Sequence, residues 1–288
     1  VRNGHARHVI CFRTVYEAAA LSRPEEFPPL RREFVDGLSQ WTAPYFAISA
    51  ACWVGQYAMR QMKRNGMTRE QLAQIALNAN RNALANPNAR NITKKQLTLD
   101  EYMEARPITT PFCLYDCDRF SDASTVVIVS AGDALDEIKT TPIRIAATAG
   151  SVHRYSWDQP DYMASYATGP DLWSKTDYRP KDVDTVQFYD GFAFFPISWL
   201  EALGFCEVGE GHKFIEGGTR IARDGELPLN TGGGQLGAGR LHGFGFAYEA
   251  ALQLRGDAGE RQIPGDPKVA VATSGGGPLA AALLLARD

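Results

Sequence analysis

The sequence predicts a layered fold in which helices cover buried β-strands, of the α/β or α+β class. Three observations lead to this prediction. The chain has 288 residues, of which 44% are hydrophobic and 22% charged, and this globular composition excludes a wholly disordered chain. Short apolar runs rich in β-branched residues, typical of buried strands, recur along the chain. Segments with the start and stop signals of helices lie between them.

The charge balance and the cysteines narrow the class of protein. Thirty Lys and Arg residues against 33 Asp and Glu residues give a formal net charge of −3, so we expect no nucleic-acid partner. We expect no membrane span, because no apolar run reaches about eighteen residues, and no secretory leader. The five cysteines are an odd number, and Cys113 and Cys117 lack a second pair or a nearby His. These features predict a reduced, cytoplasmic protein without a metal site.

The N-terminal region predicts a strand that begins in the middle of a domain. Residues 8–12 are short and largely apolar, as in a buried strand. The chain begins with Val1, and we therefore expect a front part of this domain to be missing. Residues 13–42 contain three prolines in a stretch of mixed polarity, which predicts an irregular loop.

Helix signals dominate the next region. Residues 43–65 have long-period apolar spacing and end before Gly66, a helix stop. A Thr-x-x-Gln capping box at residues 68–71 starts the next helix, which ends near Pro87. A Thr-x-x-Glu box at residues 98–101 predicts a further short helix.

Five later segments are predicted to be strands: 121–130, 142–148, 182–188, 268–273 and 279–286. A helix near residues 196–203 begins with Pro196, which suits the first turn of a helix. A Gly-rich passage at residues 232–245 leads into a helix around residues 247–254.

Four parts of the sequence, in order, resemble the thiolase superfamily and most of all its sterol-carrier-protein type branch. They are Asn86–Ala89 with Ile92–Thr93, Ser121–Ala123, Asp182–Ala193, and the Gly-rich loops 230–245 and 273–277. The resemblance runs from Gly4 to Arg287. It implies a thiolase-like αβαβα five-layered fold that lacks the first part of its N-terminal half. Residues 1–137 would be the rest of that half, with a helical loop region at about 14–110, and residues 138–288 the C-terminal half.

Departures from the family pattern bear on the chemistry. The resemblance places the nucleophilic Cys of a thiolase before Val1, and Thr273 stands where a thiolase has its second Cys. Arg240 stands at the position of the histidine in the family's Gly-His-Pro loop. Tyr189 stands where the family has Asn or His. An ordinary hydroxyl does not move a proton near neutral pH as a thiol does, so Thr273 disfavours thiolase chemistry. The Tyr189 pattern is similar to that of actinobacterial steroid side-chain aldolases, which cleave a β-hydroxy acyl-CoA and act with an OB-fold partner.

The resemblance implies a retro-aldol lyase that cleaves a steroid side-chain CoA thioester into a ketone and a short acyl-CoA. Tyr189 either deprotonates the hydroxyl or protonates the enolate, and as a base it needs a cation, Arg240 or His242, to lower its pKa. His242 is the better proton carrier. The alternatives are that Tyr189 is a tyrosine at the edge of the core and that His242 is a structural residue of the Gly-rich turn. Asp190 orients the local network or caps a helix, and Arg240 faces a carboxylate, a CoA phosphate or the reacting centre.

The substrate-binding groups come from the Gly-rich turns. Their backbone N–H groups would form an oxyanion hole for the thioester enolate, or the turns are simply tight strand ends. The residues concerned are Gly233, Gly234, Gly275 and Gly276. The second Tyr of the aldolases aligns with Phe244. The aromatic residues Tyr155, Trp157, Tyr162, Tyr166 and Trp173 form a core, a subunit contact, or a groove for a flat substrate or a partner.

Two other functions stay open. One is an acetyl-CoA acyltransferase whose nucleophilic Cys precedes Val1. The other is a non-catalytic thiolase-like protein that binds acyl-CoA or lipid. We expect a homodimer assembled with an OB-fold partner, and no cofactor other than the CoA of the substrate.

Overall fold

The computed structural model describes residues 1, 3–26, 35–37, 39–89, 92–153 and 162–288. Its main body is built on a four-stranded sheet with the strand order β5-β8-β7-β6. The strands are β5 (Arg144–Val152), β6 (Thr185–Gln187), β7 (Val269–Gly275) and β8 (Leu279–Ala286). β6 runs parallel to β7, and the other neighbours are antiparallel. This mixed sheet confirms the predicted α/β class.

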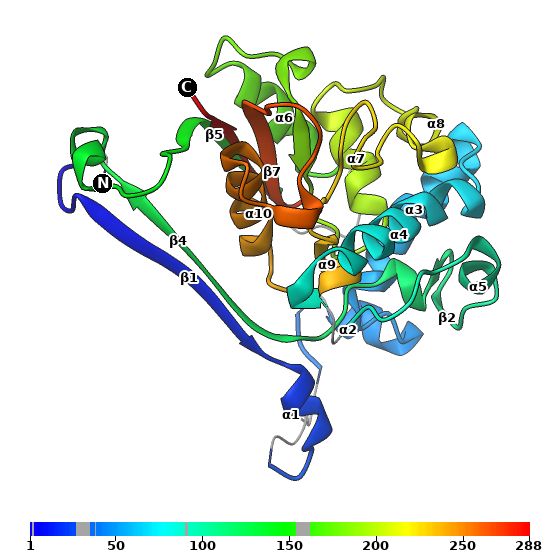
Figure 1. Ribbon diagram of the computed structural model, residues 1–288. Helices are drawn as coiled ribbons and strands as arrows, with labels where there is room; N and C mark the ends of the chain where they lie inside the picture. Colours follow the sequence, from blue (N-terminus) through cyan, green and yellow to red (C-terminus); the bar gives the residue numbers. More distant parts are fainter. Residues whose placement is uncertain (2, 27–34, 38, 90–91, 154–161) are drawn as a thin grey trace.

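A two-stranded ribbon extends along one side of the body (Figure 1). β1 (His8–Tyr16) pairs antiparallel with β4 (Asp122–Ser130) over nine residues each. The short helix α1 (Ala18–Ser22) follows β1. The prediction of an irregular loop from residue 13 was therefore wrong for its first part, because the long pairing with β4 extends the strand to Tyr16.

The predicted capping signals act as expected. Gly66, with φ 77°, closes α3 (Ala50–Asn65). In α4 (Arg69–Leu84), the Thr68 hydroxyl accepts a hydrogen bond from the Gln71 N–H, and the Gln71 side chain accepts one from the Thr68 N–H. α5 (Leu99–Met103) begins with the same reciprocal arrangement. These local hydrogen bonds satisfy N–H groups that a helix start otherwise leaves unpaired.

The later predictions hold with shifted boundaries. β8 has the predicted bounds, whereas β5 begins two residues later and extends to Val152, because it pairs with β8 along its length. The predicted helix at 196–203 is α7 (Phe194–Ala202), and the helix after the Gly-rich passage is α10 (Phe244–Arg255). The remaining α-helices and strands are α2 (Ser39–Thr42), α6 (Ser165–Trp173), α8 (Gly211–Phe214), α9 (Gly234–Ala238), β2 (Pro107–Thr109) and β3 (Phe112–Cys113). Short 3-10 turns connect them.

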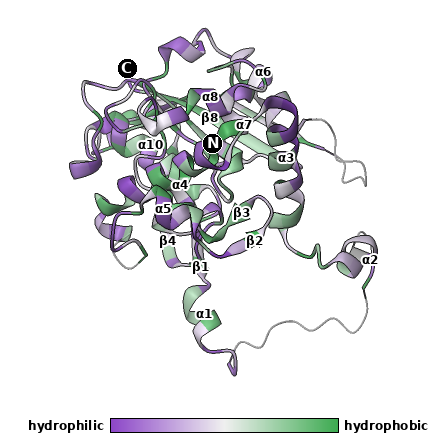
Figure 2. Ribbon diagram, turned by 90° about the vertical axis from the view of Figure 1, so that its right-hand side faces the viewer, coloured by the Kyte–Doolittle hydropathy of each residue, from purple (hydrophilic) through white to green (hydrophobic). Residues whose placement is uncertain are grey.

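Helices cover both faces of the sheet. All nine residues of α7 are buried, and with α6 they pack against one face, where Val186, Val271 and Leu284 lie. α10 packs against the opposite face through Phe246. Figure 2 shows α7 and β8 as hydrophobic segments inside the body. Burial on both faces explains why the central strand β7 reads as a continuous apolar run, whereas the edge strand β5 alternates buried and exposed residues.

The aromatic stretch belongs partly to this core. The Tyr166 hydroxyl donates to Glu201 at 2.6 Å, and the Trp173 indole N–H donates to the Leu203 carbonyl at 2.9 Å. Tyr162 is 54% exposed, and Tyr155 and Trp157 lie outside the described residues. No helix in the part of the chain that the structure describes is long and apolar enough to cross a membrane.

Candidate active site

A cavity of about 370 Å³ lies beside the end of the central strands. Tyr189, His242 and Gly275, three of the predicted site residues, line it together with Ser274. The rest of the lining comes from residues 150–152 of β5 and from residues 279–281 of β8. Tyr189 follows β6 by two residues and Gly275 ends β7, so the sheet itself brings these segments together.

Tyr189 is held at its backbone and at its ring. Its N–H donates to the Thr273 hydroxyl oxygen at 2.9 Å. The ring meets the Phe195 and Phe246 rings edge to face, at centroid distances of 5.6 and 6.3 Å. It also lies against Gly191, where a Cβ atom would come within 2.8 Å of the ring. These contacts leave the phenol with a restricted orientation.

The environment raises the pKa of Tyr189 instead of lowering it. Burial is the largest cause, and the negative charge of Asp118 acts in the same direction. The Arg240 charge and the Gln235 amide favour the phenolate, but they are outweighed. The hypothesis that a cation lowers the pKa of Tyr189 is therefore wrong for this arrangement, because burial dominates. Tyr189 therefore stays protonated at neutral pH, the state in which a phenol can donate a proton.

Arg240 faces two carboxylates. Its Nε lies 2.9 Å from Glu17 Oε2, and its Nη1 lies 3.4 Å from Asp118 Oδ1. The guanidinium also lies over the Phe120 ring, 4.5 Å from its centroid. The two carboxylates compensate its positive charge, which explains its weak influence on Tyr189.

His242 has the properties of a base. It lines the cavity next to Tyr189, and its backbone has a positive φ of 51°. Burial and the charge of Arg13 lower the pKa of the imidazole from 6.5, and a hydrogen bond with Glu17 opposes them. The neutral imidazole at pH 7 can accept a proton.

Asp190 lies outside the lining of the cavity and is completely buried. Its Oδ1 accepts a hydrogen bond from the Gln235 N–H at 2.7 Å, at the start of α9. Asp190 therefore does not cap the helix that follows it in sequence, whose N-cap is Ala193. Its Oδ2 has no hydrogen-bond partner among the described residues, and burial raises its pKa to about 7.

Of the four predicted oxyanion glycines, only Gly275 belongs to the described lining of the cavity. The Gly233 N–H donates to the Asn230 carbonyl and the Gly276 N–H to the Leu279 carbonyl, both at 2.8 Å. These two N–H groups are therefore already bonded within the protein. The expectation that they form part of an oxyanion hole was wrong for this reason. Gly234 packs against Asp190, where a side chain would collide with the carboxylate.

Phe244 is the first residue of α10 and is not part of the cavity lining. Phe246, two residues later in α10, contacts the Tyr189 ring from this helix. Neither Phe244 nor Phe246 therefore supplies the hydroxyl that the second tyrosine of the aldolases would provide.

Sequence reasoning missed Asp118 and Glu17. Asp118 has a 12% exposed side chain, and burial raises its pKa to about 6 against the opposing charge of Arg240. Glu17 lies 223 residues from its partner Arg240. Asp118 follows a strand-like bridge between Cys117 and Phe192, and only that tertiary pairing brings it to Tyr189. No spacing in the sequence signals these contacts.

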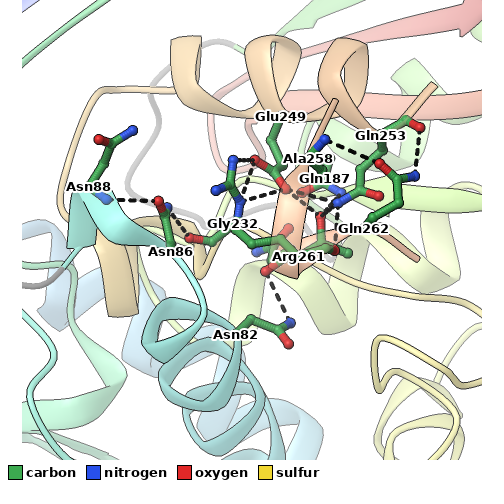
Figure 3. Close-up of polar contacts among 12 residues, drawn as sticks. Asn82, Asn86, Asn88, Gln187, Gly232, Glu249, Gln253, Ala258, Arg261 and Gln262 are labelled. Atoms are coloured by element: carbon green, nitrogen blue, oxygen red, sulfur yellow. Dashed lines mark hydrogen bonds and ion pairs between the residues drawn. The ribbon is translucent and has the colours of Figure 1, made fainter. Parts of the chain in front are cut away.

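A buried polar network supports the Gly-rich loop from the side of α10 (Figure 3). Arg261 forms an ion pair with Glu249 at 3.0 Å, and both side chains are at most 8% exposed. The Thr231 hydroxyl donates to Glu249 Oε1 at 2.9 Å and accepts hydrogen bonds from Gln187 and Gln253, both at 3.0 Å. The loop start is thereby tied to β6 and α10.

Side chains of α4 and the turn after it hold the same loop from the other side. The Asn82 amide donates to the carbonyl oxygens of Leu229 and Asn230, and the Asn86 amide donates to that of Gly232 at 2.8 Å. Among the described residues, no group of three His, Cys, Asp or Glu side chains is arranged to hold a metal ion.

Comparisons with known proteins identify relatives of this arrangement. Residues 149–286 match the family described as thiolase C-terminal domain-like, and this segment contains every residue that lines the cavity. A steroid side-chain-cleaving aldolase of Thermomonospora curvata is 29% identical over all of this chain and 75% of its own length. A 17-hydroxy-3-oxo-4-pregnene-20-carboxyl-CoA lyase of Mycobacterium tuberculosis is 31% identical over 76% of this chain. An acetyl-CoA acetyltransferase of Methanothermobacter thermautotrophicus is 35% identical over 72% of this chain.

The solved structure of an Ltp2-ChsH2(DUF35) aldolase superimposes with a TM-score of 0.87 at 28% identity. The match covers all of this chain and 74% of that one. The chain spans only 58% of the lyase and 55% of the acetyltransferase. The high structural similarity shows that the predicted thiolase-like fold is correct.

Proposed function

This chain is a member of the thiolase superfamily, and on that premise we infer that the protein is a lyase that cleaves a β-hydroxy acyl-CoA by a retro-aldol reaction. The observation that carries this proposal is the pairing of a protonated Tyr189 with a neutral His242 in one cavity. A retro-aldol reaction needs one acid and one base and no thiolate. No cysteine belongs to the described lining of the cavity.

The two groups divide the proton transfers between them. The His242 imidazole takes the proton of the β-hydroxyl, and the bond between the α and β carbons breaks. The β carbon becomes the carbonyl carbon of a ketone, and the electron pair of the broken bond forms the enolate of the remaining acyl-CoA. The Tyr189 hydroxyl then protonates the α carbon, and the imidazolium returns its proton to the phenolate. The Ser274 hydroxyl, which lies in the same cavity, is the donor that we assign to the thioester oxygen.

The relatives support a steroidal substrate and an assembly. One is named as a lyase of a 17-hydroxy pregnene carboxyl-CoA, and another as a steroid side-chain-cleaving aldolase. We assign the same class of CoA thioester to this protein. The similar solved structure is named for ChsH2(DUF35) as well as for the aldolase, and this supports a complex with a partner of that kind. A homodimer in the cytoplasm, with a partner of OB-fold type, completes the proposal.

Product analysis tests the function. The protein, together with its DUF35-type partner, is incubated with a 17-hydroxy steroid side-chain CoA thioester, and mass spectrometry measures the steroid ketone and the short acyl-CoA. We expect both products from the wild type and neither from Tyr189→Phe. Tyr45→Phe is the matched control, because this tyrosine is 83% exposed. An intact complex that releases no ketone would contradict the proposal.

A thiolase activity is the second candidate, favoured by the 35% identical acetyltransferase. It predicts that the protein cleaves acetoacetyl-CoA when free CoA is present and that a thiol-alkylating reagent abolishes turnover. Thr273 in place of the second Cys argues against this outcome. Ketone release that persists after alkylation separates the lyase from the transferase.

A further inference from the structure

The pairing between β6 and β7 ends two residues before Tyr189. β6 pairs with β7 over three residues only, and the last pair is Gln187 with Ala272. The following residue of β7, Thr273, pairs with Ala282 of β8. The chain after Gln187 therefore leaves the sheet, and side chains take over the hydrogen bonds that a neighbouring strand would supply.

Two side chains perform this task. The Asn230 amide donates to the Phe188 carbonyl at 2.9 Å, and its oxygen accepts from the Phe188 N–H at 2.7 Å. The Thr273 hydroxyl oxygen accepts from the Tyr189 N–H at 2.9 Å. Both side chains are at least 97% buried, so water does not compete with these bonds.

We propose that Thr273 is a positioning residue whose hydroxyl holds Tyr189, and with it the phenol, in its working place in the cavity. The proposal rests on the lyase function, for which Tyr189 is the acid. Thr273 itself sits on a strand with neighbours on both sides, β6 and β8, and so provides a rigid support. Its β-branched side chain has few rotamers, which keeps the hydroxyl in a defined direction.

The hydrogen bond from the Tyr189 N–H to the Thr273 hydroxyl matters because no neighbouring strand holds the backbone of Tyr189. Its ring is contacted by Phe195 and Phe246, while its backbone is anchored by Thr273. Without the acceptor, the Tyr189 N–H lacks a partner, and the backbone moves to satisfy it. A shift of the reacting group by about 1 Å lowers a rate by up to about a hundredfold.

The proposal also gives the residue at position 273 a role of its own. The family resemblance places a second cysteine here, and a thiol sulfur is a weak hydrogen-bond acceptor. A hydroxyl accepts strongly at the same place. At position 273, this protein therefore has a hydroxyl that holds the Tyr189 N–H, where the family has a thiol that moves a proton.

Four variants test this role. Thr273→Ser keeps the hydroxyl, Thr273→Val removes it at nearly constant volume, and Thr273→Cys replaces it by a thiol. Thr168→Val is the matched control, because this buried threonine on α6 makes its hydrogen bond to Ala164 within its own segment. If Thr273→Val is too unstable to purify, Thr273→Ala takes its place.

The first measurement does not need activity. Tyrosine is labelled with ¹³C at Cζ, the Tyr189 resonance is assigned with Tyr189→Phe, and its chemical shift is followed with pH. We expect an unchanged resonance in Thr273→Ser and Thr168→Val, and a displaced one in Thr273→Val and Thr273→Cys. A wild-type resonance in Thr273→Val overturns the proposal, even if the protein proves to be no lyase.

The second measurement is the rate of ketone release. We expect kcat to fall up to about a hundredfold in Thr273→Val, with KM changed less than about twofold, because the bond positions the acid and does not bind substrate. Thr273→Ser retains kcat within about threefold. Equal losses of kcat in Thr273→Val and Thr168→Val would contradict the proposal, because the effect would then not be specific to the hydrogen bond with Tyr189.

Discussion

The guanidinium of Arg240 forms an ion pair with Glu17, 2.9 Å away in space and 223 residues away in the sequence. The same guanidinium reaches Asp118, whose charge is the largest electrostatic influence on Tyr189 after burial. His242 also lies next to Glu17, at 3.5 Å. The charged groups around Tyr189 and His242 therefore come from segments that lie far apart in the sequence.

Asp118→Asn should lower the pKa of Tyr189. The native carboxylate disfavours the phenolate, so its removal makes deprotonation of the phenol easier. If Tyr189 must be protonated for turnover, the alkaline limb of the pH profile of kcat moves to lower pH. The profile of the exposed control Asp136→Asn should match the wild type. An alkaline limb at its wild-type position in Asp118→Asn would contradict the assignment.

His242 should produce the acid limb of the pH profile. Burial lowers the pKa of its imidazole from 6.5, so kcat/KM falls only when the pH drops below that value. We expect His242→Gln to lose about 100- to 10,000-fold in kcat, the range of general acid–base catalysis, and to lack this limb. His5→Gln serves as the control on an exposed histidine. Survival of the limb in His242→Gln would assign the base to another group.

Asp190 should make stability depend on pH. Its pKa is 3.8 in an unfolded chain and about 7 in the folded protein. The folded state therefore holds a proton that the unfolded state has released, and this contribution to stability is lost as the pH rises through that interval. Asp190→Asn keeps an acceptor for the Gln235 N–H and should flatten the pH dependence of Tm. A steeper dependence in the variant would refute the protonated Asp190.

The buried pair of Glu249 and Arg261 should be costly to break. Glu249→Ala leaves the Arg261 guanidinium without its partner, and we expect a loss of about 3–5 kcal/mol in the free energy of unfolding. Urea unfolding measures it. The exposed pair of Arg220 and Glu226, whose side chains are 43% and 61% exposed, is the control, and Glu226→Ala should cost about 0–1 kcal/mol. Similar losses of unfolding free energy in Glu249→Ala and Glu226→Ala would show that the buried ion pair contributes no more to stability than the exposed one.

Local chemistry made much of the fold predictable. The capping boxes of α4 and α5 and the helix stop at Gly66 depend on residues within four positions of one another, so their hydrogen bonds are visible in the sequence. The apolar run of β8 has the same bounds in sequence and structure. Arg13–Tyr16 was missed because this stretch of mixed polarity becomes a strand only through pairing with β4.

The sequence by itself determined the capped starts of α4 and α5 and the strands of the main sheet. The strand predicted to be buried at residues 8–12 was wrong in its burial, because β1 lies in an exposed ribbon where Ile10 and Phe12 are each 65% exposed. Together with the family resemblance, it also singled out Tyr189, His242 and Gly275, which line one cavity in the structure. Only the tertiary structure decided what these groups can do. Burial and the distant Asp118 raise the pKa of Tyr189, Arg240 is compensated by Glu17, and Gly276 uses its N–H within the turn. The physical reason is that hydrogen bonds of caps and runs of apolar residues are local, whereas desolvation and charge act between segments that only the fold brings together.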